Sequence, residues 1–485
     1  MPNRHREMPC QHSEQKQYTT QPNQPNHYNY YNHSSHSSTN TPHHPSQTNQ
    51  SQISNSPSQT NHLTQQQTLL HLLGICGEYP TNNLSIIIPS AAYGRKLVAD
   101  LVKNGIIKLA YKDKLRGYRL KNKGKKLLLE KHPDRFDLYL ATKSETNHPP
   151  SDPSRRKRLM SQAEVLALMH MSGVAIFPDV KPDVFGAKST PLADESHPAP
   201  VGEIMESPGE SRLGSGIPSH IPQPHIPISP FQPPHPNNTP SILPFPSFYT
   251  SREYKRGDGT KGDGKPEVVR GSRGAGILMT PTTVYNVYNT GDSITKWAPE
   301  VEYKWRIEVE STVSRKLMFD QYRGADVGGI LMGKSMELLE HYIREMFKQQ
   351  SMLSFFMQTY DPFYFITNDE YGKTQLELLC NPKAMYDLHA MMGAKLKPRN
   401  KTHPVEHDAL TGDNIPILFL PLLNIPRLVR FRSGLGMGMD NGISKGMVFG
   451  FDFQQEVIER WLRAEGADVE FKCINITKVR GRFLC

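Results

Sequence analysis

The chain lacks the signatures of several large classes of protein. Its 485 residues include five scattered cysteines without CxxC or Cys/His spacing, which argues against a disulfide framework or a zinc module: Cys10, Cys76, Cys380, Cys473 and Cys485. We assign no metal site. No secretory signal is present, and no apolar run approaches the ~20 residues that a membrane helix needs. The longest apolar run, Ile415–Val429, is interrupted by prolines, so we expect a broken core strand there. We therefore expect a soluble, cytoplasmic protein with no membrane contact.

Aliphatic residues are almost missing from the first sixty positions, which consist mainly of Gln, Asn, Ser, Thr, His and Pro. Such a segment cannot bury enough apolar surface to offset its chain entropy, so we expect residues 1–63 to be a disordered tail. Residues 133–247 form a connecting region, with one predicted helix at Leu159–Met171 and a Pro-rich linker at Pro218–Pro246. The two remaining segments, 64–132 and 248–485, have the patterning of folded domains.

Positive charge is concentrated in one short segment. Between Ala91 and Arg135 there are 14 Lys and Arg against 4 Asp and Glu, an excess of ten, and the whole chain also sums to +10. The charges of the remaining residues, taken together, therefore sum to zero. A positive field confined to one small segment suits a polyanion, because each neutralised phosphate releases condensed counterions.

Residues 64–132 have the order of elements of a winged helix-turn-helix. Apolar spacing predicts a helix at Gln65–Ile75, and Ser90 and Gly105 are the expected start and stop of a second helix. In that second helix the apolar residues fall on one face, and the opposite face is small and basic, as a major-groove helix requires. The remaining expected elements are a short apolar piece at Leu84–Ile88, strands at Ile106–Ala110 and Gly117–Leu120, and a helix at Asn122–Lys131.

This pattern predicts binding of double-stranded DNA. Arg95 and Lys96 are the best candidates for groove contacts, and the other cations would position the protein on the phosphate backbone. The predicted contact residues are Arg95, Lys96 and Lys103 on the helix, Lys112, Lys114 and Arg116 near the hairpin tip, and Lys121, Lys123 and Lys125 after it.

The runs at 97–107 and 116–124 resemble a family signature. Leu97–Ile107 followed by Arg116–Gly124 is similar to the "Leu…Gly-Ile, wing, Tyr-x-Leu-Thr-x-x-Gly" pattern of winged-helix transcription factors and of the replication-relaxation proteins of plasmids and conjugative elements. Lys121 and Asn122 stand where that pattern has Thr or Ser. The resemblance implies a role in plasmid or conjugative-element replication, relaxation or transfer, with a larger C-terminal α/β domain.

Strand-like and helix-like segments alternate from Phe248 to Cys485, which predicts an α/β domain, with α+β as the alternative. Expected strands are at 275–280, 283–288, 362–366, 417–423, 447–451 and 469–476. Expected helices are at 301–318, 335–348, 382–392 and 454–465. We expect this domain to act as a module that binds a protein partner or has a regulatory role.

Two motifs suggest catalytic alternatives. Gly328–Ser335 matches the phosphate-loop pattern GxxxxGK[ST], which would place nucleotide contacts at Gly333, Lys334 and Ser335. Its apolar centre instead favours a core strand that turns into a helix. Asp292, Glu302 and Lys304 have the acid…acid-x-Lys form of a nuclease site. Only these enzymatic alternatives would require a cofactor, Mg²⁺. A third alternative is a scaffold in which the winged helix binds another protein.

Overall fold

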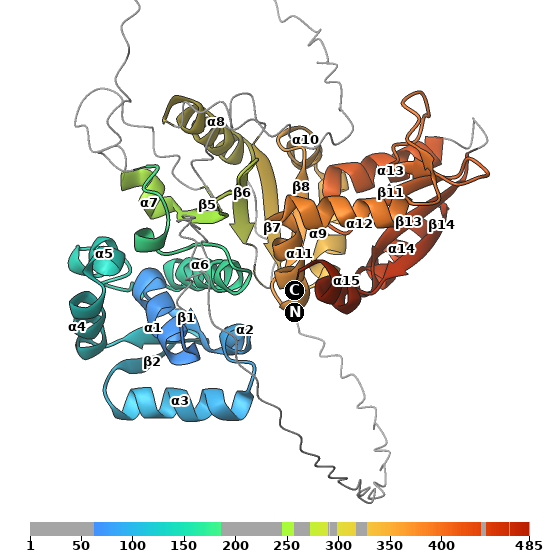
Figure 1. Cartoon of the computed structure of the whole chain (residues 1–485). Coiled ribbons are helices and arrows are strands. Elements are labelled where there is room, and N and C mark those ends of the chain that lie inside the picture. The colour runs from blue at the N-terminus through green and yellow to red at the C-terminus, as the bar shows by residue number, and fades with distance from the viewer. Residues whose placement is uncertain are drawn as a thin grey trace, which may run out of the picture. The chain divides into compact units, whose positions relative to one another are not determined.

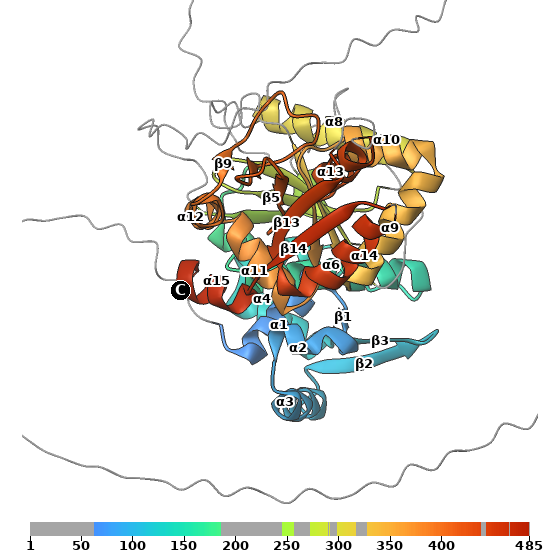
Figure 2. The ribbon, with the colours of Figure 1, turned by 90° about the vertical axis from the view of Figure 1, so that its right-hand side faces the viewer.

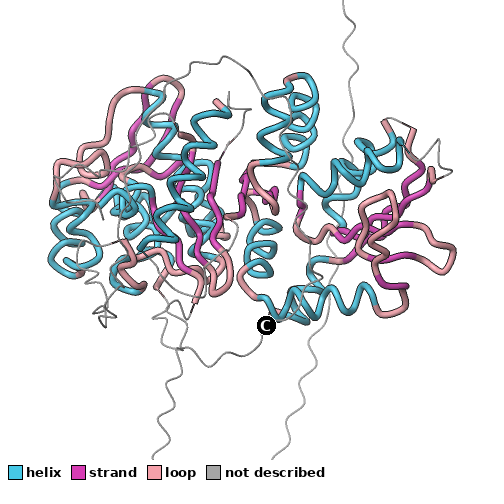
Figure 3. The backbone as a smooth tube through the Cα atoms, turned by 90° about the horizontal axis from the view of Figure 1, so that it is seen from above, coloured by secondary structure: helices cyan, strands magenta, loops and turns pink. Residues whose placement is uncertain are grey.

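The computed structural model describes residues 63–185, 245–256, 272–289, 291, 298–316, 327–437, 443–464 and 466–484. The predicted tail up to residue 62, most of the Pro-rich linker and Asp292 lie outside these residues. The described chain has mixed α/β structure, which confirms the fold class at that level (Figures 1 and 3). Within it, no helix is long and apolar enough to cross a membrane.

The first part of the described chain contains a small sheet surrounded by helices. The strands pair in the order β1-β3-β2, and both pairings are antiparallel. Up to residue 141, the elements are α1 (Gln65–Cys76), β1 (Tyr79–Pro80), a 3-10 turn (Thr81–Asn83), α2 (Leu84–Ile87), α3 (Ala91–Lys103), β2 (Ile107–Lys112), β3 (Leu115–Leu120), α4 (Asn122–Lys131), α5 (Pro133–Phe136) and a π-helical turn (Asp137–Ala141).

Local sequence explains where these elements begin and end. Thr64 and Gln67 form a capping box at the start of α1, and the Ser90 hydroxyl accepts a hydrogen bond from the backbone N–H of Tyr93 at the start of α3. Gly105 follows α3 with φ +70°, the left-handed conformation that ends many helices. The predicted helices at 65–75, 90–104 and 122–131 are thus confirmed to within one residue at each end.

The hairpin is longer than the sequence predicted. Asp113 and Lys114 both have positive φ, 53° and 62°, and form a two-residue turn between Lys112 and Leu115. A turn of this kind matches the twist of the two strands, and it normally uses Asn or Gly, which is why Asp-Lys gave no signal. The six residues between the predicted strands are therefore mostly strand, not loop.

Helix α6 (Pro153–Met171) also begins earlier than predicted. The Asp152 carboxylate accepts a hydrogen bond from the backbone N–H of Arg155 at 2.8 Å, and Pro153 occupies the first helical position. The basic run 155–158 therefore forms the first turns of the helix instead of preceding it. A 3-10 turn (Pro178–Val180) follows α6.

The remaining chain forms two sheets, both mixed. The six-stranded sheet has the order β12-β8-β7-β6-β5-β4, with β6, β7 and β8 parallel. The five-stranded sheet has the order β14-β13-β11-β10-β9, with β11, β13 and β14 parallel. The strands are β4 (Ser247–Thr250), β5 (Gly274–Met279), β6 (Val284–Asn289), β7 (Gly328–Gly333), β8 (Phe363–Thr367), β9 (Lys397–Pro398), β10 (Ala409–Leu410), β11 (Pro416–Phe419), β12 (Leu423–Asn424), β13 (Lys445–Phe451) and β14 (Asp468–Ile474).

Helices connect these strands, and the four helices predicted in this part of the chain are confirmed to within two residues at each end. The prediction of one broken core strand at Ile415–Val429 is wrong, because this run contains two short strands in different sheets and then the start of a helix. The helices are α7 (Ser251–Arg256), α8 (Pro299–Lys316), α9 (Met336–Lys348), α10 (Gln350–Gln358), α11 (Glu370–Leu379), α12 (Pro382–Gly393), α13 (Ile425–Met437), α14 (Gln455–Arg463) after a 3-10 turn (Asp452–Gln454), and α15 (Ile476–Phe483).

Helix α6 packs with the N-terminal helices and also contacts the six-stranded sheet and helix α11. Its buried residues, such as Leu166, belong to one core cluster that also includes Leu72 of α1 and Leu376 of α11. The side-chain N–H of Asn289, at the end of β6, donates to the backbone oxygen of Ser161 at 2.8 Å. Residues 133–185 thus contribute to the core that supports α3 and the hairpin.

Candidate nucleic-acid interface

Helix α3 presents a basic face to solvent. Gly94, Leu97, Val98 and Leu101 are buried, and Arg95, Lys96 and Lys103 are exposed, as the helical spacing predicted. The helix lies at the edge of the molecule, where its outer face is uncovered by other described elements (Figures 1 and 2). Ala92 and Ala99 are exposed on the same outer face, so small side chains separate the cations. This face can approach a groove closely.

The hairpin of β2 and β3 extends beside α3 (Figure 2). Its tip is basic. Lys112, Lys114 and Arg116 are all exposed, and the Arg116 guanidinium lies 5.9 Å from the centre of the Tyr111 ring. Tyr111 is 66% exposed and Leu109 is 45% exposed. The hairpin therefore offers both cations and apolar surface to a partner.

The lysines at the start of α4 differ in what they contact. Lys121 is exposed, and the Lys123 ammonium donates to the backbone oxygen of Asn104 at 3.2 Å. The Lys125 ammonium donates to the backbone and side-chain oxygens of Asn147, and burial, followed by repulsion from Lys108, lowers the pKa of Lys125. Lys125 thus holds the following loop of its own chain, so it is a weaker candidate for phosphate contact than Lys121.

A shallow groove lies between these lysines and the hairpin. It is lined by backbone of Gly105 and by side chains that include Lys108, Arg119, Lys121, Lys123 and His148, and its described lining contains no carboxylate. Arg119 is paired with Glu78, so the exposed cations that anionic groups along this groove would meet are Lys108, Lys121 and Lys123. The groove extends the basic surface from the end of α3 to the start of α4.

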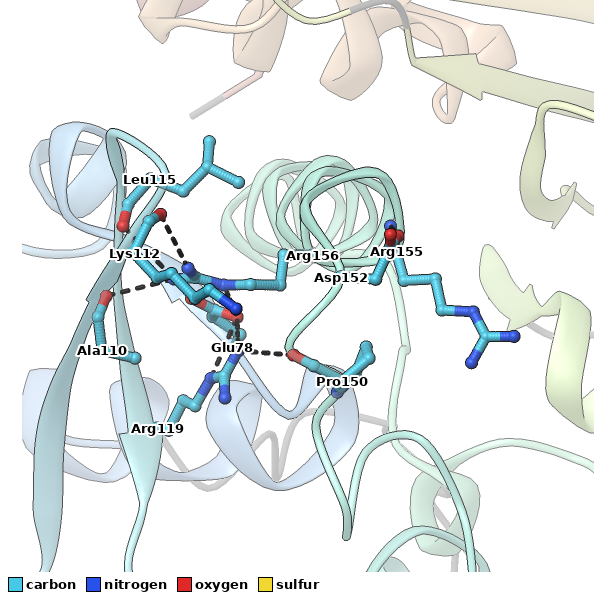
Figure 4. Close-up of polar contacts among 9 residues, drawn as sticks. All are labelled: Glu78, Ala110, Lys112, Leu115, Arg119, Pro150, Asp152, Arg155 and Arg156. Atoms are coloured by element: carbon cyan, nitrogen blue, oxygen red, sulfur yellow. Dashed lines mark hydrogen bonds and ion pairs between the residues drawn. The ribbon is translucent and has the colours of Figure 1, made fainter.

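Sequence reasoning missed a buried ion cluster beneath the hairpin (Figure 4). Glu78 is completely buried and accepts hydrogen bonds from two arginines: Arg119 of β3 at 2.6 Å and Arg156 of α6 at 2.5 Å. Arg156 is itself only 1% exposed. The basic run at 155–158 suggested surface cations, and no signal in it distinguished the one that is buried. The partner acid lies 78 positions away in the chain.

The phosphate-loop motif forms a core strand, which was the favoured interpretation. Residues 328–333 are β7, all buried and paired in parallel with β6 on one side and β8 on the other. Their amides are used in the sheet and cannot surround a phosphate as a phosphate loop requires. Gly333 ends the strand, Lys334 is exposed, and Ser335 is the residue before α9.

The residues of the nuclease hypothesis do not come together in the described part of the chain. Glu302 is fully buried, and its two oxygens accept hydrogen bonds from the Ser272 hydroxyl and the Arg273 backbone N–H, each at 2.8 Å. Burial raises the pKa of Glu302. Lys304 is exposed on the other side of α8, since two residues differ by about 200° around a helix. Glu302 therefore holds the start of β5 instead of facing solvent.

In the described residues, no group of three or more His, Cys, Asp or Glu side chains could hold a metal ion. Comparison of the chain with protein-family models, curated proteins and solved structures gives no match.

Proposed function

We propose that this protein binds double-stranded DNA through a winged helix, with α3 in the major groove and the β2-β3 hairpin as the wing. The observation that supports this most is the division of α3 into a buried apolar face and an exposed face with Arg95, Lys96 and Lys103. A groove helix needs that division, because its scaffold side packs while its cations remain free to contact base edges and phosphates.

The hairpin and the start of α4 would add phosphate contacts on either side of α3. Lys112, Lys114 and Arg116 are at the wing tip, and Lys121 and Lys123 border the basic groove. Phosphate contacts of this kind fix the position of a protein on a duplex but carry no sequence information. Specificity would therefore depend on Arg95 and Lys96.

The biological role we propose is control of replication, relaxation or transfer of a plasmid or conjugative element. Its support is the resemblance of residues 97–107 and 116–124 to the replication-relaxation proteins. In this proposal the sheets of residues 245–484 form a module that binds a protein partner or regulates DNA binding.

The test is duplex binding by the full chain, measured by fluorescence anisotropy between 50 and 300 mM salt. Because each phosphate contact contributes about −0.9 to the slope of log K against log salt, we expect a slope of about −5 to −7. Reversing Arg95 and Lys96 to Glu should weaken binding about a hundredfold at constant salt. The matched control reverses Lys395 and Lys401, two exposed lysines outside the proposed interface, and should change little.

One observation favours a second function, binding of another protein by the hairpin. Leu109 and Tyr111 are exposed apolar residues on β2, and Tyr93 on α3 is 46% exposed. A flat salt response together with unchanged binding in the Arg95/Lys96 variant would contradict DNA binding and favour this alternative.

A further inference from the structure

The hairpin tip is held from one side by a single guanidinium. Arg156 donates to the backbone oxygens of Lys112 at 3.0 Å, Ala110 at 3.1 Å and Leu115 at 3.3 Å, while the same side chain is bonded to Glu78. Two of these carbonyls, those of Lys112 and Leu115, belong to the residues that flank the turn. Figure 4 shows Arg156 reaching from α6 to the hairpin, whereas its neighbour Arg155 points away.

The tip needs such support because its own sheet gives it little. Strand β1 pairs only with Tyr118 and Gly117 of β3, so the hairpin beyond Gly117 is two-stranded. An isolated two-stranded hairpin is marginally stable in water. In this two-stranded part the side chain of Tyr111 on β2 is exposed, so it adds little packing. The five N–H groups of a guanidinium, held in a fixed plane, can bond the carboxylate and three carbonyls at once.

Glu78 and α6, to which Arg156 connects the hairpin, are themselves held in place. The Glu78 carboxylate is fixed between Arg119 and Arg156, and Arg119 also donates to the backbone oxygen of Pro150 just before α6. Farther along α6, the side-chain N–H of Asn289 at the end of β6 donates to the backbone oxygen of Ser161. The hairpin is thus tied to a helix that is itself tied to the C-terminal sheets.

We propose that Arg156 is a positioning residue for DNA binding, which fixes the hairpin so that Lys114 and Arg116 meet the duplex. This inference rests on the proposed function, and it extends the DNA-binding unit from residues 64–132 to include α6. A chain that ends at His132 would lose Arg156 and leave Glu78 with Arg119 as the one remaining partner of the two arginines. Arg156 itself contacts no nucleic acid in this proposal, although it lies in the basic run.

The experiment compares Arg156→Lys with Arg155→Lys in the full chain. Lysine keeps the positive charge beside Glu78, so the fold is retained, but it cannot bond three carbonyls and the carboxylate together. We expect amide hydrogen exchange of residues 107–120 to be about ten times faster in Arg156→Lys, and the Kd for duplex to rise about tenfold. Arg155→Lys, the exposed neighbour, should leave both unchanged.

A double-mutant cycle separates positioning from direct contact. Lys114 and Arg116 are changed to Ala in the wild type and in Arg156→Lys. If Arg156 acts through the hairpin, its effect on Kd should largely disappear once the tip cations are gone. Full additivity, or hairpin exchange that stays at the wild-type rate in Arg156→Lys, would overturn the proposal. Failure of the wild type to bind duplex would refute the proposed function, and the exchange data would still decide whether Arg156 holds the hairpin.

Discussion

The stability of this protein should depend steeply on pH because of one buried histidine. His71 of α1 is 2% exposed, and its Nδ1 atom accepts a hydrogen bond from the Arg135 guanidinium at 2.9 Å. Arg135 in turn forms a bidentate pair with Asp179 and lies 4.3 Å from the centre of the Phe177 ring. Burial, followed by the charge of Arg135, lowers the pKa of His71 to about 3.

The sign of the effect follows from comparing the folded and unfolded chains. In the unfolded chain the pKa of a histidine is about 6.5. Between about pH 6.5 and 3, His71 is therefore protonated in the unfolded state but stays neutral in the folded state. Stability is therefore complete above pH 6.5 and falls as the pH drops from about 6.5 toward 3. Because one pKa unit corresponds to about 1.36 kcal/mol, His71 should lower the free energy of unfolding by about 2 kcal/mol at pH 5. His170, whose pKa burial and Arg135 lower to about 4, acts in the same direction.

The assay is urea unfolding at pH 7.5 and pH 5.0, followed by circular dichroism. His71→Asn keeps an oxygen near the position of Nδ1 to accept from Arg135 but cannot titrate. We expect this variant to be less stable at pH 7.5, because it loses ring packing against Phe136, and to lose about 2 kcal/mol less than wild type on acidification. His148→Asn, at an exposed position, is the control. If His71→Asn loses as much free energy as wild type between the two pH values, the reasoning is wrong.

Two further predictions concern single lysines. Lys114→Gly should raise the free energy of unfolding by about 0.5–1 kcal/mol, because glycine adopts the φ of 62° without strain. The same variant should bind duplex more weakly, because it lacks one cation at the hairpin tip. Urea unfolding measures the first effect and fluorescence anisotropy measures the second. Lys334→Ala should leave ATP affinity, measured by calorimetry, as it is in wild type, because the preceding amides belong to β7. A loss of measurable ATP binding in that variant would revive the nucleotide hypothesis.

The ends of α3 and its exposed basic face were predicted correctly because their signals are local. The faces of α3 follow from a 100° step per residue, and Ser90 and Gly105 set its ends by capping chemistry that acts within four residues. The same locality explains the success with β7, whose apolar centre at Ile330–Met332 identified a buried strand despite the phosphate-loop letters. These features depend on residues close together in the sequence, so they could be predicted without the tertiary structure.

The predictions that failed concern residues whose environment is set by parts of the chain far away in sequence. Nothing near Arg156 in the sequence indicates that Glu78 lies beneath the hairpin, and nothing near Pro416 indicates that β11 and β12 enter different sheets. Glu302 is similar, because its burial depends on β5, which begins 28 residues earlier. In each case the role of a residue is set by which distant element covers it, and periodicity does not report that.

Pairing with distant residues also reduces the number of cations in residues 91–135 that are available to DNA. Two of its 14 cations face inward and pair with acids outside the segment: Arg119 with Glu78, and Arg135 with Asp179. Their charges are neutralised in the folded protein and cannot release counterions from DNA. Lys125, held by Asn147, is a third cation that is not free. Of the nine predicted contact residues eight remain, so the salt slope should not exceed about −7 in magnitude. A steeper slope would mean that cations outside α3, the hairpin and α4 also reach the duplex, and the exposed lysine of the α6 basic run, Lys157, would be the first to neutralise.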